Sequence, residues 1–194
     1  MHSLDDPPLA AAPTRSAVIV PVPAAEHAVA AHRAHLDRSA GWGVPPHLTV
    51  LYPFLPPSQL NEQTLSTLAA AVTTVASFTV TFAATAWFGS EVLWLAPTPE
   101  QPLRQLTTAV FSAFPDHPPY GGAHGTDPAD VQPHLTVGEG ALAGPEGIGV
   151  LQAAEEDAQT RLPFSQHLDH ALLITGSEEP RSWRTFCRLE LGSR

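Results

Sequence analysis

The five-residue segment Pro-His-Leu-Thr-Val occurs twice in the sequence, once in each half. Its β-forming residues predict a strand, in which side chains two positions apart point to the same face. His47 and Thr49 therefore share one face in the first copy, and His134 and Thr136 share one face in the second. If the two strands lie side by side, two imidazoles and two hydroxyls surround one point of a common cleft.

Two histidines and two threonines suit the cleavage or formation of a phosphodiester bond. The imidazole pKa lies near neutrality, so one histidine can accept a proton while the other, protonated, donates one. The base activates the nucleophile, and the acid protonates the oxygen of the leaving group. Threonine hydroxyls can donate hydrogen bonds to the non-bridging phosphate oxygens, where negative charge accumulates in the transition state. This chemistry requires no metal and no cofactor.

Two tyrosines and two arginines are further candidates for the site. Tyr52 and Tyr120 can stack on a base or bind a phosphate oxygen, although packing explains each equally well. Arg184 and Arg188 alternate with an aromatic residue and a cysteine, so they face either the cleft or, by preference, solvent. We therefore predict Tyr52 and Tyr120 as substrate-binding residues and leave the arginines out.

A long Pro/Gly-rich loop precedes the second copy and contains several possible metal ligands, namely Asp116, His117, His124, Asp127 and Asp130. Loops of this length in compact domains are usually functional or disordered. The ligand spacing fits no familiar metal-binding pattern, and acidic residues in loops are normally solvated. A metallohydrolase built on this loop is therefore a weaker hypothesis, and we predict no metal site.

Hydrophobic periodicity predicts the elements that must position the repeated segments. Alternating or short apolar runs predict strands at 17–22, 47–54, 78–87, 91–97, 134–138, 168–175 and 183–191. Glycine and serine between the third and fourth of these predict a hairpin. Helical spacing predicts helices at about 24–38, after Ser58, after Thr98 and at about 145–161.

Local signals refine three of these helices. The first helix places Ala25, Ala28, Val29, His32 and Leu36 on one apolar face. Ser58 is predicted to cap the second helix, whose buried stripe is Leu65, Leu68, Val72 and Val75. Thr98 is predicted to cap the third, with Pro99 in the first position and Gln101 completing a capping box.

Each half of the chain thus contains helices, several strands and one copy of the repeated segment. The pattern predicts an α+β fold of two pseudo-symmetric lobes, each an antiparallel-rich sheet with helices outside, around a central cleft. Residues 1–14 are rich in proline and include acids, so we expect a disordered N-terminal tail. Residues 15–194 are expected to form a single bilobal domain.

The two repeated segments resemble the paired His-x-Thr-x motifs of the 2H phosphoesterase superfamily, specifically its 2′-5′ RNA ligase-like family. The segments GVPPHLTVLYPF, VLWLAP, LRQLTTAVFSAF, PPYGG and the second PHLTV match that family's pattern in order, from about residue 16 to 191. The resemblance implies two related α+β lobes with both histidines and both threonines in the cleft. It also implies hydrolysis of 2′,3′-cyclic or linear phosphodiesters of nucleotides or RNA ends, or ligation of RNA ends.

The amino-acid composition narrows the range of binding partners that the protein can be expected to have. The net charge is −10, and lysine is absent, whereas proteins that hold long nucleic acids usually present a basic surface. We therefore expect a small nucleotide cyclic phosphate or an RNA end, and no long nucleic acid. No apolar run reaches membrane-spanning length, the N-terminus does not resemble a secretory signal, and Cys187 is a single cysteine. These features predict a cytoplasmic protein without a membrane partner, which we expect to be a monomer.

The sequence therefore predicts a metal-independent phosphodiesterase acting on a small cyclic phosphate or an RNA terminus by two-histidine acid/base catalysis. The alternative is a non-catalytic nucleotide- or phosphate-binding module that uses the same cleft. Which histidine is the acid and which the base stays open, because the repeat makes their local sequences nearly equivalent.

Overall fold

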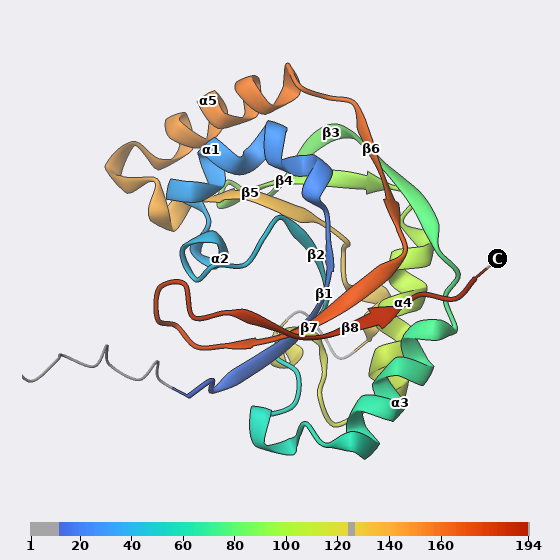
Figure 1. Cartoon of the computed structure of the whole chain (residues 1–194). Helices are drawn as coiled ribbons and strands as arrows, with labels where there is room; N and C mark the ends of the chain where they lie inside the picture. Colours follow the sequence, from blue (N-terminus) through green and yellow to red (C-terminus); the bar gives the residue numbers. More distant parts are fainter. Residues whose placement is uncertain (1–11, 124–126, 194) are drawn as a thin grey trace, which may run out of the picture.

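Two four-stranded antiparallel sheets form the centre of the protein in the computed structural model, which describes residues 12–123 and 127–193 (Figure 1). Residues 1–11 of the predicted tail lie outside the described residues. The first sheet has the order β2-β1-β7-β8, with β1 Arg15–Pro21, β2 His47–Leu51, β7 His170–Gly176 and β8 Arg184–Glu190. The second has the order β5-β4-β3-β6, with β3 Phe78–Phe88, β4 Val92–Thr98, β5 Leu135–Glu139 and β6 Phe164–Leu168.

The strands of the repeated segments occupy equivalent places in the two sheets. β2 is an edge strand of the first sheet and β5 is an edge strand of the second, and these two edges contact each other. Each pairs with the strand that precedes it in the chain, β1 or β4, after an intervening helical segment. The sheets therefore meet along the two strands that the sequence predicted to lie side by side.

Within the described residues, four α-helices pack against the sheets, and a short fifth, α2, lines the cavity between them; their bounds are α1 Glu26–Leu36, α2 Arg38–Gly41, α3 Glu62–Thr73, α4 Gln101–Ala113 and α5 Gly147–Gln159. α1 and α5 contact strands of the second sheet, while α3 and α4 contact strands of the first (Figure 1). α1 follows β1 of the first sheet but packs on β5 of the second, and α4 follows β4 but packs on β2. The two lobes are thus interlocked. The predicted α+β fold of two related antiparallel sheets is confirmed.

One contiguous apolar core joins the two sheets. Leu48 and Val50 from β2 and Leu135 and Val137 from β5 are at most 3% exposed and belong to this core. Burying each such side chain stabilises the fold by about 1.5–3 kcal/mol relative to exposure. The alternating apolar residues therefore fix the strand orientation and leave His47, Thr49 and Thr136 on the opposite, partly exposed face.

Strand prediction missed β6 and extended β2 too far. Within β6, Ser165 and His167 are exposed, and only Leu168 is buried, so the segment has little hydrophobic signal. It forms a strand because β3 offers it an antiparallel partner along its whole length. β2 ends at Leu51, before the cis Tyr52–Pro53 bond, and not at residue 54.

Two predicted helix caps are wrong. α3 begins after Asn61, whose side chain forms a capping box with Thr64, and not after Ser58. α4 begins at Gln101 after Glu100, without a side-chain cap bond. Thr98 cannot cap it because Thr98 is still part of β4, where it pairs with β3.

The predicted apolar face of α1 is wrong at one position. Ala28, Val29 and Leu36 are buried, but Arg33 is also buried, and His32 is only half-buried. His32 Nε2 lies 2.6 Å from Asp157 of α5, so it joins two helices at their surface. Arg33 can be buried because Asp37 and the carbonyl oxygen of Val44 accept hydrogen bonds from its guanidinium.

Candidate functional site

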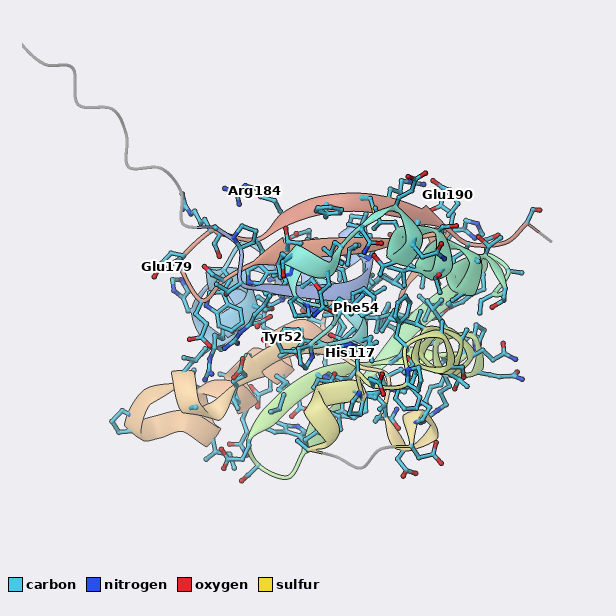
Figure 2. All side chains as sticks on the ribbon, turned by 90° about the horizontal axis from the view of Figure 1, so that it is seen from below. Tyr52, Phe54, His117, Glu179, Arg184 and Glu190 are labelled. Atoms are coloured by element: carbon cyan, nitrogen blue, oxygen red, sulfur yellow. The ribbon has the colours of Figure 1, made fainter. Side chains whose placement is uncertain are left out.

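All six predicted site residues line one cavity of about 350 Å³. The first sheet and its flanking segment contribute His47, Thr49 and Tyr52, and the second half contributes Tyr120, His134 and Thr136. Figure 2 shows Tyr52 in the middle of the molecule, between the two layers of ribbon. The geometry therefore places both His-x-Thr pairs at a common site, as their spacing predicted.

The two imidazoles are held by the same hydrogen bond. His47 Nδ1 lies 2.8 Å from the carbonyl oxygen of Pro45, and His134 Nδ1 lies 2.8 Å from the carbonyl oxygen of Gln132. A carbonyl oxygen only accepts, so each Nδ1 carries a proton and donates it. Nε2 is then the basic nitrogen of each neutral ring, and the same tautomer is fixed at both positions.

An arginine from a helix supports the approach to each histidine. Arg33 of α1 donates from Nη2 to the carbonyl oxygen of Val44, three residues before His47 (3.3 Å). Arg104 of α4 donates from Nη1 to the carbonyl oxygen of Val131, three residues before His134 (2.8 Å). Each arginine thus holds the backbone beside the carbonyl that receives Nδ1–H.

Sequence reasoning missed this pair of arginines, although a signal was present. The repeat is longer than five residues, because residues 44–50 and 131–137 share the pattern Val-x-Pro-His-Leu-Thr-Val. Each arginine also has a carboxylate one helical turn away, Asp37 for Arg33 and Glu100 for Arg104. A search for helical Arg–acid pairs before each copy would have identified both.

The two arginine pairs differ in burial. Arg33 and Asp37 are 4% and 3% exposed, and their Nε–Oδ2 distance is 2.7 Å. Ser39 donates to Asp37 through both its backbone N–H and its hydroxyl, which completes the buried network. Arg104 and Glu100 are 31% and 37% exposed, and Gln132 bonds to both. The first histidine therefore lies near a buried ion pair, whereas the ion pair before the second is partly exposed.

His47 is only partly exposed, and this desolvation, followed by the positive charge of Arg33, lowers its pKa to about 4 against the opposing effect of Asp37. His134 also lowers the pKa of His47, which shows that the two rings interact electrostatically. A histidine with such a pKa is neutral at pH 7 and can accept a proton at Nε2.

The predicted tyrosines reach the cavity in different ways. Tyr120 has a left-handed backbone (φ 52°), and its N–H donates to the carbonyl oxygen of Tyr52 (2.6 Å). Its side chain hydrogen-bonds Thr49, and burial raises the pKa of its phenol. The Tyr52 hydroxyl accepts from Arg15 (3.0 Å), which in turn pairs with Glu178. Tyr120 thus contacts a predicted catalytic residue, whereas Tyr52 forms part of the wall.

Two tryptophans that sequence reasoning did not select, Trp42 and Trp183, also line the cavity. The Trp183 ring lies directly against Gly176 of β7, where any Cβ atom would collide with it. Its Nε1–H donates to the carbonyl oxygen of Ser177 (2.8 Å), and Tyr52 lies 6.2 Å away ring to ring. The sequence alone does not identify this contact, because Gly176 and Trp183 meet only once the hairpin between them has formed.

On the other side of the site, aromatic rings surround His134. The Phe88 ring lies edge-on to the imidazole at 4.9 Å, and the Trp94 ring lies 6.0 Å from it. Phe88 and Trp94 stack on each other at 4.8 Å. Trp94 is the strand partner of Thr136, in the place that Ile19 occupies opposite Thr49.

A sequence model of the 2′-5′ RNA ligase superfamily matches residues 20–178. The chain belongs to this superfamily. The match includes both repeated segments and both histidines, and the resemblance to 2H phosphoesterases of the 2′-5′ RNA ligase-like type is confirmed. No curated protein matched the chain in sequence.

Solved structures with the same fold include members of this superfamily. Escherichia coli LigT complexed with phosphate is 22% identical, with a TM-score of 0.52 over 93% of this chain and 99% of LigT. TT0787 of Thermus thermophilus is 17% identical, with a TM-score of 0.56 over 93% and 99%. A structure described as a phosphoesterase is 21% identical, with a TM-score of 0.55 over 94% and 100%. At these identities the likeness shows the fold.

The two arginines considered for the site do not line its cavity, and the described metal-ligand candidates of the loop are not arranged to hold a metal. Arg184 and Arg188 are exposed, and Figure 2 shows Arg184 at the outer surface.

Over residues 12–123 and 127–193, no group of three or more His, Cys, Asp or Glu side chains is arranged to hold a metal. His124 lies outside the described residues, and the His117 ring lies 6.4 Å from that of Phe54. No helix in the described part of the chain is long and apolar enough to cross a membrane.

Proposed function

We propose that the chain is a metal-independent phosphodiesterase that hydrolyses, or reversibly forms, a phosphodiester of a small nucleotide or an RNA terminus. The bond is of the 2′,3′-cyclic or the 2′-5′ type. The observation that supports this proposal is that the two histidines make the same hydrogen bond and line the same cavity. Both hold a proton at Nδ1 against the backbone, and both line the cavity that also contains Thr49 and Thr136.

In this mechanism His47 is the general base and His134 the general acid. His47 is neutral at pH 7, because burial and Arg33 lower its pKa to about 4. Its Nε2 takes a proton from the attacking water or hydroxyl as the new P–O bond forms. The bond between phosphorus and the leaving oxygen breaks, and that oxygen takes the proton from Nε2 of His134. The reverse reaction exchanges the two roles.

The threonines stabilise the charge on phosphorus. Thr49 and Thr136 donate to the non-bridging oxygens, which become more negative in the transition state. Tyr120 orients the Thr49 hydroxyl through their side-chain hydrogen bond. Tyr52 belongs to the aromatic wall and binds the sugar or base by contact.

The size and charge of the site support a small substrate. The cavity of about 350 Å³ is in the range of pockets for small ligands, and the chain has a net charge of −10. Solved structures of LigT hold phosphate, 3′-AMP and ATP. Nucleotide-sized phosphoesters are therefore the first substrates to test, and a long nucleic acid is not part of the proposal. We also propose that the protein is a monomer and is cytoplasmic, since its single cysteine excludes an internal disulfide.

The test is a panel of 2′,3′-cyclic mononucleotides, 2′-5′-linked dinucleotides and cyclic-phosphate RNA ends, assayed with and without excess chelator. The proposal expects turnover of at least one class, unchanged by chelator and reduced by His47→Ala and by His134→Ala. Binding without product across the whole panel would instead favour the non-catalytic phosphate-binding module. Activity that disappears with chelator would support a metal-dependent enzyme.

A further inference from the structure

A second cavity of about 470 Å³ adjoins the first on the side of the second sheet. It shares with the first cavity Tyr120, His134, Thr136 and Glu139. Its own walls are largely apolar, from Phe88 and Val92 at the β3–β4 hairpin and Val131 before the second repeated segment. His47 and Thr49 line only the first cavity. The proposed acid therefore lies between two spaces, whereas the proposed base faces one.

The second cavity offers a flat apolar platform beside His134. Phe88 is 36% exposed and stacks on the buried Trp94, which fixes the orientation of its ring. Large apolar side chains that are partly exposed and supported from behind are typical of surfaces that bind a ligand ring. Aromatic side chains bind nucleic-acid bases by stacking, which tolerates any base because each has a π-face.

Apart from His134, the charged side chains that line the second cavity within the described part of the chain are acidic: Asp130, and Glu139, which also lines the first cavity. Asp130 is exposed, and Glu139 is half-buried, with its Oε2 atom 3.7 Å from Arg38 Nη2. Arg38 lines the first cavity and not the second, so a phosphate in the second cavity meets carboxylates without that guanidinium, whereas an uncharged ring is unaffected. The cavity therefore favours an uncharged nucleoside-like group over a nucleotide.

We propose that the second cavity binds the leaving group of a linear phosphodiester, as a nucleoside without a further phosphate. This inference rests on the proposed function, because it uses His134 as the acid. His134 lines both cavities, so the oxygen that receives its proton belongs to the group in the second cavity. As the P–O bond breaks, the nucleoside leaves with that proton as a free alcohol, and the phosphoryl group remains between the threonines. In a 2′,3′-cyclic phosphate the leaving oxygen belongs to the same ribose that keeps the phosphate, so no second nucleoside is released, and only a linear phosphodiester places a separate nucleoside in this cavity.

The experiment compares the cleavage of three substrates by the wild-type protein. They are 2′-5′-linked ApA, the same dinucleotide with a 3′-phosphate on the leaving adenosine, which is the one attached through its 5′ oxygen, and adenosine 2′,3′-cyclic phosphate. We expect kcat/KM for ApA to exceed that for its phosphorylated form by about tenfold or more. Equal rates for the two dinucleotides would overturn the inference. Turnover of the cyclic phosphate alone would overturn it too, while the proposed function would stand. If none of the three is cleaved, the inference fails, whereas the proposed function fails only if the whole panel of nucleotides and RNA ends is also left intact.

Two variants then locate the effect in the second cavity. Phe88→Ala removes the stacking platform, and Val92→Phe fills the cavity without removing the ring that contacts His134. We expect each variant to lower the ratio of kcat/KM for ApA to that for the cyclic phosphate by about 5- to 100-fold. Phe186→Ala is the control, because Phe186 is an exposed aromatic residue on β8 that lines neither cavity. Equal losses on both substrates would mean that the variants only disturb His134, and would overturn the subsite.

Discussion

The two halves of the molecule hold their histidines with the same backbone geometry but place them in different surroundings. In both, Nδ1 donates to the carbonyl two residues back, and a helical arginine binds the carbonyl before that. In the first half that arginine and its carboxylate are almost fully buried, while in the second they are about one-third exposed. Backbone hydrogen bonds therefore set the direction of each imidazole, whereas its surroundings set the proton affinity.

The difference also separates two roles that the repeated sequence left equivalent. Around His47, burial and a positive charge favour the neutral ring, which suits a base. Around His134, Phe88 and Trp94 provide an apolar platform, and the second cavity opens beside it. In the proposed mechanism, near-identical strands therefore supply the base and the acid because different helices and strands pack against them.

The largest expected effect concerns the two arginines. Arg33→Met leaves the carboxylate of Asp37 buried without its partner, so we expect the free energy of unfolding to fall by about 3–5 kcal/mol. Arg104→Met is the matched variant in the second half, and we expect a loss of about 1 kcal/mol, because its ion pair is solvated. Urea denaturation measures both. Equal losses would contradict the difference between the two halves.

The double variant Arg33→Met/Asp37→Asn is expected to recover much of that stability, because it removes both charges and keeps an acceptor for Ser39. In this variant the pKa of His47 should rise, since Arg33 lowers it more than Asp37 raises it. The acid limb of kcat/KM should therefore move to higher pH. An unchanged limb would mean that Arg33 holds the backbone only.

The next effect tests the shared geometry of the histidines. His47→Ala and His134→Ala should each lower kcat by about a hundredfold or more, as the loss of a general base or acid does. The double variant should be far less than multiplicatively worse, because the two residues act as a unit. Circular dichroism checks that the variants fold. Near-normal turnover by either single variant would exclude the two-histidine mechanism.

A smaller effect follows from the pKa of His47. Its folded-state value of about 4 lies below the unfolded value of about 6.5, so between these limits only the unfolded chain is protonated there. Stability should therefore fall as the pH decreases from 6.5 to 4, by up to about 1.4 kcal/mol per pH unit from this group. Above about pH 6.5 the contribution is constant. His47→Gln should remove this part of the slope, and an identical slope in the variant would contradict the assigned pKa.

The smallest effect concerns Tyr120, which hydrogen-bonds the threonine of the first half. Tyr120→Phe removes one net hydrogen bond and should lower kcat by about 2- to 10-fold, with little change in stability. Tyr52→Phe is the control within the same wall, since the Tyr52 hydroxyl bonds Arg15 and not a threonine. A larger effect for Tyr52 than for Tyr120 would reverse their proposed roles.

Periodicity was sufficient to place the strands of the repeated segments, because their alternating apolar residues must enter the core. The predicted helix caps were wrong for two different reasons: Asn61 and not Ser58 caps α3, whereas Thr98 is held in β4 by pairing with β3, so α4 begins without a side-chain cap bond. β6 was missed because its residues are mostly polar, and its strand conformation comes from pairing with β3.

The sequence by itself determined that two His-x-Thr pairs exist, that each lies on one face of a strand, and that the chain is acidic. Those properties follow from residue type and from the two-residue period of a strand. Tertiary packing sets which residues surround each pair: Arg33 near His47, Trp183 against Gly176, and Phe88 beside His134. These contacts join segments far apart in the chain, and so do the burial and charge that lower the pKa of His47. Proton affinity and substrate shape are set by such long-range contacts, which no local pattern of residues contains.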